Sequence, residues 1–136
     1  MMNKLSIYLL FDGTCKPAME FYNEIFGGEL HMTKVAETPA KDQLPVNFHE
    51  KILNARLLSS QIDISASDWL RPQETPIQGN KVCLYLSGGQ FNELKSIFNK
   101  LSEGANVTDP LRKEFYGAYG ALNDKFGNRW MFHTEN

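Results

Sequence analysis

The sequence predicts an α+β fold made of two copies of a unit with the element order strand, helix, strand, strand, strand (βαβββ). Two segments carry hydrophobic residues at the three- and four-residue spacing of an amphipathic helix, and each follows a β-prone run. Each helical segment ends at glycine, and further β-prone runs follow it. Because the same order occurs twice, a duplicated unit is the simplest explanation.

The composition is that of one globular domain. The chain has 136 residues, of which 42% are hydrophobic, so it can bury a core. The net charge is -2 and the 14 Lys and Arg residues form no basic run, which argues against nucleic-acid binding. No stretch approaches the roughly 18 apolar residues of a membrane span, and residues 1–11 do not resemble a secretory signal. We therefore expect a cytoplasmic protein whose partners include neither nucleic acid nor a membrane.

The first unit opens with a predicted strand at residues 4–11, which ends at the turn signal Asp12-Gly13. Thr14 is the expected N-cap of the helix that follows. Gly27-Gly28 ends this helix, because glycine readily adopts the left-handed conformation of a C-cap. The apolar face of the helix is formed by Ala18, Phe21, Tyr22, Ile25 and Phe26.

Three further strands complete the first unit. They are expected at residues 29–37, 51–59 and 61–66, and the last two are joined by a tight turn. Residues 38–47 contain two prolines and mixed charges, so they are expected to form a loop. A proline-rich connector follows at residues 70–80.

The second unit repeats this order. Gly88-Gly89 separates its first strand from its helix, and Gly104 ends the helix. The apolar face of this helix is formed by Phe91, Leu94, Ile97, Phe98 and Leu101. The strands are expected at residues 81–86, 105–108, 116–122 and 129–134.

These elements predict a single domain over residues 1–136, with module one at 1–69, the connector at 70–80 and module two at 81–136. A helix covers only one face of its sheet, so the other face must be buried against something else. Two paired units let their sheets curl around a shared interior. Such a concave interior is the usual place for a small ligand.

The chain resembles PhnB-like proteins of the vicinal oxygen chelate superfamily, which includes glyoxalase I, extradiol dioxygenases, and fosfomycin- and bleomycin-resistance proteins. The run FDGTCKPAMEFYNEIFGGEL resembles their opening, and the similarity continues through ILNARL, QIDISASD and KVCLYL. It ends with EFYGAYGALNDKFGNRWMF, which is similar to their closing pattern. The resemblance implies two paired βαβββ modules with curled mixed sheets around a shared pocket, and commonly a homodimer.

The resemblance also implies where a metal would bind, because metal-using members take ligands from the first and last strand of each module. The matching positions here are Ser6, Asp63, Lys81 and Met131, and catalytic members carry Glu at the last of these. Divalent metals prefer His nitrogen or carboxylate oxygen, so only Asp63 fits. PhnB-like proteins often carry His in the strand matching ILNARL, where this chain has Asn54. We therefore expect neither a metal nor another cofactor.

Other metal-binding residue types do not form a recognisable motif. His31, His49 and His133 are not spaced with another His or a Cys in a ligand pattern, and are expected to be exposed or at the edge of the core. Acidic residues elsewhere could supply a ligand only if the strand register differs from the expected one. They are Glu20, Glu50, Asp68 and Glu114.

Two alternatives are open for Asp63 and Lys81. If both side chains face the pocket, an ion pair between them would occupy the space that a metal fills in relatives, since a buried charge needs a partner. Otherwise one or both point outward and are solvated. The expected ligand-binding set includes both residues, and no catalytic residue is assigned.

Aromatic residues are the other candidate site feature. Aromatic walls with a few polar tips suit a flat organic ligand, although packing alone would also explain each of these residues. Gly117 and Gly120 favour a place near the pocket mouth for the tyrosines beside them, because glycine permits close backbone approach. The aromatic residues expected near the cavity are Tyr8, Trp69, Phe115, Tyr116, Tyr119 and Trp130. The expected ligand-binding residues are Tyr8, Asn54, Asp63, Lys81, Tyr116, Tyr119 and Trp130.

The two cysteines give no catalytic pattern. Cys15 and Cys83 lie far apart without a CxxC motif, which favours reduced thiols over a disulfide. A place near a helix N-terminus could lower the pKa of the Cys15 thiol. A small half-buried residue is the simpler interpretation, because no His lies nearby in sequence.

Together these observations favour a metal-free protein that binds a small organic molecule. The alternative is a metal-dependent lyase, isomerase or dioxygenase of the glyoxalase type, in which a metal polarises vicinal substrate oxygens. A third idea is the demethylubiquinone methyltransferase activity that is sometimes attached to PhnB-like proteins. FGGEL and LSGGQ do not form a glycine-rich loop for S-adenosylmethionine, which argues against it.

Overall fold

The computed structural model describes residues 2–136 and divides the chain into two compact units. The first ends at Pro76 and the second runs from Ile77 to Asn136. This boundary falls inside the segment that the sequence marks as a connector, residues 70–80. A single functional domain over residues 1–136 stays a prediction.

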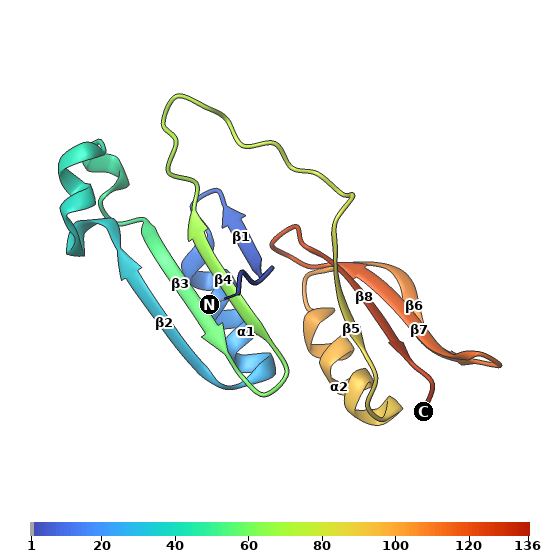
Figure 1. Cartoon of the computed structure of the whole chain (residues 1–136). Coiled ribbons are helices and arrows are strands. Elements are labelled where there is room, and N and C mark those ends of the chain that lie inside the picture. Colours follow the sequence, from blue (N-terminus) through green and yellow to red (C-terminus); the bar gives the residue numbers. More distant parts are fainter. Residues whose placement is uncertain (1) are drawn as a thin grey trace. The chain divides into compact units, whose positions relative to one another are not determined.

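The first unit is a four-stranded mixed sheet with one helix (Figure 1). Its strand order is β1-β4-β3-β2, with β1 parallel to β4 and the other neighbours antiparallel. The elements are β1 (Ile7–Phe11), α1 (Cys15–Phe26), β2 (Glu29–Lys34), β3 (Ile52–Leu58) and β4 (Asp63–Asp68).

The second unit has the same topology, with strand order β5-β8-β7-β6 and β5 parallel to β8. Its elements are β5 (Cys83–Ser87), α2 (Phe91–Leu101), β6 (Asn106–Glu114), β7 (Gly117–Asn123) and β8 (Arg129–Thr134). The predicted α+β fold of two βαβββ units is confirmed. Among residues 2–136, neither helix is long and apolar enough to cross a membrane.

Each helix buries its apolar face against its own sheet, as the spacing predicts. Ile25 and Phe91 are half-buried, and the other members of both predicted faces are buried. The Phe98 ring of α2 meets the Phe132 ring of β8 edge-on, with centroids 5.0 Å apart. In α1 the fully buried side chains include Met19 and Tyr22.

The strands expose their second face, which we call the open face of each sheet. In β4, Ile64, Ala66 and Asp68 are buried on the helix side, as the hydrogen bond from the Cys15 N–H to Asp68 shows. In β8, the buried side chains of Trp130, Phe132 and Thr134 alternate with half-buried ones. Because successive strand residues point to opposite faces, the residues between the buried ones belong to the open faces.

The segment between β2 and β3 differs from the prediction. The expected strand at 29–37 ends at Lys34, and three short 3₁₀ helices replace the rest of it and much of the expected loop. They are Val35–Glu37, Pro39–Gln43 and Val46–Phe48. Backbone hydrogen bonds from Val35 to Lys51 and from Ala36 to His49 hold the segment, and sequence spacing does not reveal them.

Strand β6 is longer than the predicted 105–108 because it continues past Pro110. Proline cannot donate a ladder hydrogen bond, but β6 is an edge strand. Its pairing with β7 also shifts register between Val107 and Asp109 and again between Asp109 and Arg112. The edge position and these irregularities accommodate the proline.

The start of α1 is stabilised differently from the expectation. Thr14 makes no side-chain cap hydrogen bond. Instead, the buried Asp68 carboxylate accepts hydrogen bonds from the backbone N–H groups of Cys15 (3.0 Å) and Ile52 (2.8 Å). One carboxylate therefore connects α1, β3 and β4.

Candidate functional site

The duplication places one tyrosine at the same point on each open face. KLSIYL at residues 4–9 aligns with KVCLYL at residues 81–86, so Tyr8 matches Tyr85. Tyr8 pairs with Ser65 across the β1–β4 ladder, and Tyr85 pairs with Met131 across the β5–β8 ladder. The two tyrosines are 50% and 58% exposed.

Tyr85 is not among the residues predicted from the sequence. The internal repeat would have identified it, because Tyr85 aligns with the predicted residue Tyr8. The repeat also changes the expected metal positions: Ser6 aligns with Cys83, and Lys81 aligns with Lys4. The family resemblance treats Ser6 and Lys81 as corresponding positions. In the repeat alignment, however, Lys81 lies two residues before the counterpart of Ser6.

Counted from Met131, the first- and last-strand positions that lie together are Met131 and Tyr85 in the second sheet, with Ser65 and Tyr8 as their repeat counterparts in the first. These residues offer thioether, phenol and hydroxyl groups, whereas hard divalent metals prefer imidazole or carboxylate. Within either unit of the described chain, no three His, Cys, Asp or Glu side chains gather in a way that could hold a metal. We therefore derive no chemistry through a metal.

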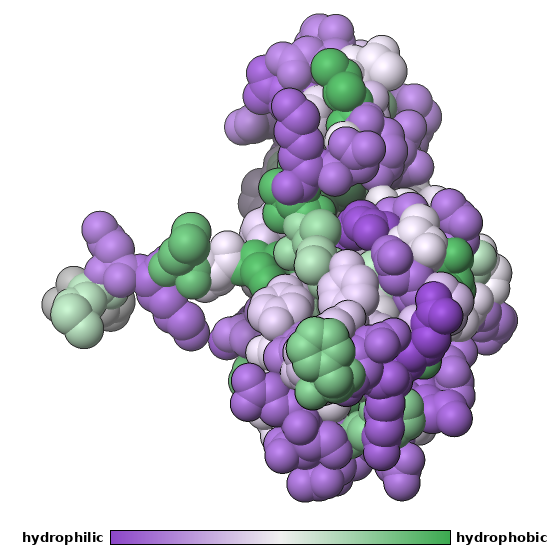
Figure 2. Space-filling view, turned by 90° about the vertical axis from the view of Figure 1, so that its right-hand side faces the viewer, coloured by the Kyte–Doolittle hydropathy of each residue, from purple (hydrophilic) through white to green (hydrophobic). Residues whose placement is uncertain are grey.

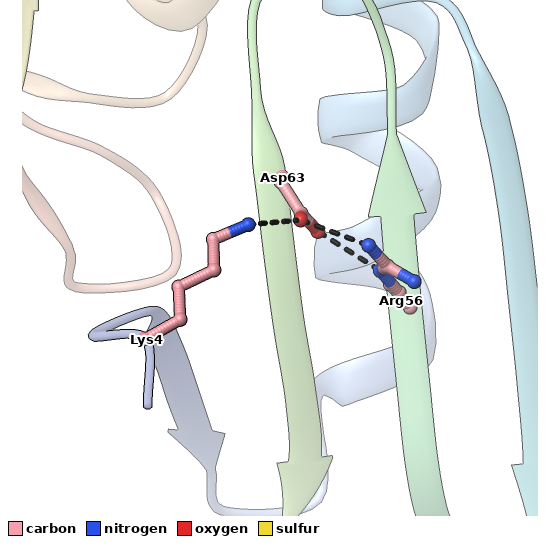
Figure 3. Close-up of polar contacts among 3 residues, drawn as sticks. All are labelled: Lys4, Arg56 and Asp63. Carbon is pink, nitrogen blue, oxygen red and sulfur yellow. Dashed lines mark hydrogen bonds and ion pairs between the residues drawn. The ribbon is translucent and has the colours of Figure 1, made fainter. Parts of the chain in front are cut away.

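Asp63, the one carboxylate among the expected metal positions, is held by cations (Figure 3). Its two oxygens accept hydrogen bonds from Nε and Nη2 of Arg56, each at 2.9 Å, and Lys4 Nζ lies 3.9 Å from Oδ2. The Arg56 hydrogen bonds are the main reason that the pKa of Asp63 lies below its ordinary value. Lys81 is exposed ahead of β5. Asp63 is thus contacted by Lys4, which is the repeat counterpart of the predicted partner Lys81.

A row of polar side chains crosses the open face of the first sheet. The ladder pairs His31 with Arg56, Arg56 with Ser65, and Ser65 with Tyr8. Asn54 lies two residues before Arg56 on the same face and is exposed. The structure therefore brings the predicted residues Tyr8, Asn54 and Asp63 to one face, and adds Arg56 to them.

Tyr119 lies on β7 and pairs with His133 of β8 and Arg112 of β6. On β8 the open face also carries Arg129, whose Nη1 donates to the Thr108 hydroxyl at 2.9 Å. Tyr119 occupies the repeat counterpart of Asn54. The second open face thus carries Tyr85, Tyr119 and the thioether of Met131.

Tyr116 lies at the tip of the β6–β7 hairpin and is half-exposed. Its ring meets the fully exposed Phe115 ring edge-on at 5.2 Å between centroids. A depression of about 240 Å³ adjoins this tip. It is lined by Lys113, Glu114, Phe115, Gly117, Ala118, Glu135 and Asn136. Gly120 serves packing, since a Cβ there would press on Leu111 of β6 and Phe98 of α2.

Trp130, which we predicted as a ligand contact, belongs to the core of the second unit. It is 2% exposed, and its indole Nε1–H donates to the buried Asp124 carboxylate at 2.8 Å. It lies next to Met131 along a strand, so these two side chains must point to opposite faces. Trp69 is anchored in the connector, where its Nε1–H donates to the carbonyls of Arg71 and Glu74.

Three other candidates, His49, His31 and Glu50, have structural partners. His49 Nε2 lies 2.9 Å from the Lys41 carbonyl and 3.1 Å from that of Leu44, so its Nε2–H holds the loop. His31 lies 3.6 Å from Glu29, and Glu50 lies 3.0 Å from Lys34.

The Cys15 thiol is the opposite of an activated nucleophile. Burial, reinforced by the Asp68 carboxylate, raises its pKa to about 12. The alternative of a lowered pKa is therefore wrong, because the loss of solvation outweighs the helix N-terminus. The preferred interpretation, a structural residue, agrees with the structure, although Cys15 is fully buried and not half-buried. Cys15 and Cys83 are both free thiols.

The structure is similar to those of known proteins over nearly the whole chain. Protein PA1353 from Pseudomonas aeruginosa is 29% identical with a TM-score of 0.86, covering 98% of both chains. A Bacillus cereus PhnB protein, described as a putative 3-demethylubiquinone-9 3-methyltransferase, is 20% identical with a TM-score of 0.72, covering 97% and 99%. A glyoxalase/bleomycin resistance protein/dioxygenase family enzyme from Burkholderia phytofirmans PsJN is 14% identical with a TM-score of 0.60, covering 96% and 97%.

The match to a family model is equally extensive. The model described as 3-demethylubiquinone-9 3-methyltransferase matches residues 3–132, which is almost the entire sequence. Both repeated units fall within this match. The chain therefore belongs to the family that this model describes, and it shares its fold with a PhnB protein and with a glyoxalase/bleomycin resistance protein/dioxygenase family enzyme.

Proposed function

We propose that the protein binds a small organic molecule at the open faces of its sheets, without using a metal. The observation that carries this proposal is the set of side chains at the first- and last-strand positions: Tyr8, Ser65, Tyr85 and Met131. Phenol rings and a thioether suit an organic surface, and none of the four is a preferred ligand of a divalent ion.

The exposure of these residues supports the proposal. Large hydrophobic side chains that remain exposed in contiguous groups often mark a binding surface. Tyr8 and Leu10, which are neighbours on one face of β1, are each about half-exposed on the first open face, and Tyr85 is so on the second. In the space-filling view, hydrophobic residues also reach the surface among hydrophilic ones (Figure 2).

Metal uptake and ligand binding can be measured side by side. Untagged protein should take up no stoichiometric Ni²⁺, Zn²⁺, Mn²⁺ or Fe²⁺ in equilibrium dialysis, and its melting temperature should rise with planar aromatic compounds. Met131→Glu, which restores the carboxylate found in catalytic relatives, is the matched variant for the metal arm. Tight one-to-one metal uptake by the unmodified protein would favour the glyoxalase-type enzyme instead.

The family description names a methyltransferase, but we do not extend that activity to this chain. Each sheet in the described residues has four mixed strands, unlike the doubly wound parallel sheet that binds nucleotide-like cofactors. Incubation with S-adenosylmethionine should leave the melting temperature unchanged.

We further propose that the protein acts as a cytoplasmic homodimer. The two free thiols agree with a reducing compartment, and the exposed hydrophobic residues would be partly covered in a dimer. Light scattering after gel filtration should give twice the 15.5 kDa chain mass, and a monomer at micromolar concentration would contradict the dimer.

A further inference from the structure

Arg56 is held in one orientation by a neighbouring strand. Its Nε–H and one Nη2–H donate to the two oxygens of Asp63, each at 2.9 Å (Figure 3). A guanidinium has five N–H donors in a fixed plane, so three remain: the second on Nη2 and both on Nη1. The Arg56 side chain is 53% exposed, so these three are accessible from the open face.

The surroundings of Arg56 supply additional donors. Its cross-strand neighbours are His31 and Ser65, and Tyr8 follows in the same row. Lys4 lies 3.9 Å from the same Asp63 carboxylate. At Asp63 itself, two cations surround one carboxylate, whereas the Glu29 carboxylate lies across the ladder from Leu58 and 3.6 Å from His31. The positive charge of Arg56 and Lys4 favours an anionic ligand group beside them.

An apolar surface adjoins these donors on the same face. Leu10 follows Tyr8 by two residues in β1 and lies level with Ser67 of β4, on the side of the row away from Asp63. Tyr8 and Leu10 are 50% and 57% exposed. A ligand that combines an oxyanion with a flat apolar body would satisfy both parts of this surface.

The second unit lacks the same arrangement. Its counterpart of Arg56 is Ala121, because Ala121 pairs with Met131 as Arg56 pairs with Ser65. The counterpart of Asp63 is Arg129, which contacts Thr108 and Asp109 instead. The duplicated fold does not require an Arg–Asp pair at this point, so the pair is a specific feature of the first sheet.

We propose that Arg56, oriented by Asp63, binds the carboxylate or phosphate oxygens of the ligand, whose apolar body lies over Tyr8 and Leu10. This inference rests on the proposed small-molecule function and names the ligand class as an organic oxyanion. An ion-paired guanidinium is preorganised, so it loses less side-chain freedom when it binds a second oxyanion. Asp63 is a positioning residue in this arrangement.

Backbone amide NMR titration of the full chain tests the proposal with three probes: benzoate, phenyl phosphate and the neutral benzamide. At least one anion should shift the amides of β1, β3 and β4 and bind about tenfold more tightly than benzamide. Arg56→Lys keeps the charge but removes the planar fork, and should weaken that anion about tenfold. Arg71→Lys, the same exchange on an exposed arginine that pairs with Glu74 in the connector, should leave its affinity unchanged.

Two results would overturn the inference: equal affinity for benzamide and the anions, or an unchanged affinity in Arg56→Lys. If neutral aromatic compounds still shift these amides, only the role of Arg56 fails and small-molecule binding stands. If no probe shifts any amide, both proposals fail. Thermal unfolding of each variant checks that the fold is retained.

Discussion

Asp68 provides the hydrogen-bond acceptor that the expected N-cap Thr14 does not provide at the start of α1. Its carboxylate is 3% exposed and accepts backbone hydrogen bonds from the start of α1 and the start of β3. Both N–H groups would otherwise be buried donors without an acceptor, which is costly in a folded protein. The sequence does not reveal this role, because the donors lie 53 and 16 residues from Asp68.

Asp68→Asn should lower the free energy of unfolding by roughly 2 kcal/mol, because an amide can accept only one of the two hydrogen bonds and turns an N–H toward the other donor. Urea denaturation measures this loss. Asp12→Asn makes the same exchange on an exposed side chain near the same helix and should change stability by less than about 0.5 kcal/mol. Equal stability of the two variants would contradict the connecting role of Asp68.

Cys15 should be unreactive in the folded protein. With a pKa of about 12, only about one thiol in ten thousand is ionised at pH 8. In Cys83→Ser, where Cys15 is the remaining cysteine, a disulfide reagent should label the native protein orders of magnitude more slowly than the urea-unfolded chain. Rapid labelling of native Cys83→Ser at pH 8 would contradict the burial of this thiol.

The same pKa predicts an alkaline loss of stability. The folded thiol keeps its proton up to about pH 12, whereas an unperturbed thiol releases it near 9.0. Between these values the folded state binds more protons, so the free energy of unfolding falls as pH rises. The stabilisation is complete below about pH 9. Chemical denaturation from pH 8 to 11 should show a steeper decline for the native protein than for Cys15→Ala.

Residue-level prediction works best for side chains whose environment depends on nearby sequence. Tyr8, a predicted ligand contact, is half-exposed on the open face, and its role stays a prediction. Trp130 is buried in the core, and the two-residue strand period already separates it from Met131. Arg56 was missed because an arginine on a strand is usually solvated. Its pairing with Asp63 depends on the β3–β4 register, which sequence spacing does not fix.

At the scale of elements, the turn from α1 to β2 depends on two glycines with different roles. Gly27 and Gly28 have φ values of 69° and 88°, in the left-handed region. A Cβ on Gly27 would have no neighbour within 4 Å, whereas one on Gly28 would overlap the Leu58 carbonyl and Ser59. The second glycine therefore also permits close approach of the β3–β4 hairpin.

Gly27→Ala should cost roughly 2 kcal/mol of unfolding free energy, because a backbone with φ 69° and ψ -162° is essentially restricted to glycine. Gly28→Ala should cost roughly 2 kcal/mol more, because the turn must also move away from backbone atoms. Thermal and urea unfolding measure the stability of both variants. Because the two glycines are adjacent, each variant serves as the control for the other. A Gly28→Ala variant as stable as Gly27→Ala would show that the turn relaxes freely.

Element-level prediction was strongest where hydrophobic period and glycine agreed. The face of α2 and the bounds of β8 match the expected residues, because both patterns extend over several residues. The 3₁₀ segments after β2 were missed because their geometry depends on contacts with residues near His49 and Lys51. The extension of β6 past Pro110 likewise depends on its place at a sheet edge.

At the scale of the whole molecule, the duplication separates stability from binding. Both units bury a helix-facing layer with the same topology, and their open faces differ in the residues that matter for recognition. The first carries Arg56, Asp63 and Asn54, whereas the matching positions of the second are Ala121, Arg129 and Tyr119. The two units thus share one architecture but carry different side chains on their open faces. We therefore expect each unit to make different contacts with the ligand.

This separation predicts opposite effects for aromatic residues on the two sides of the sheets. Tyr8→Ala combined with Tyr85→Ala should change the free energy of unfolding by less than about 1 kcal/mol, because both rings are half-exposed. Trp130→Ala, at 2% exposure, should cost roughly 3–5 kcal/mol through the cavity it leaves. The tyrosine variant should nevertheless lose most of its response to aromatic ligands in thermal-shift assays. If it unfolds as readily as Trp130→Ala, the open faces contribute to the core and the tyrosines are structural; if it is stable and still binds, the ligand uses a different surface.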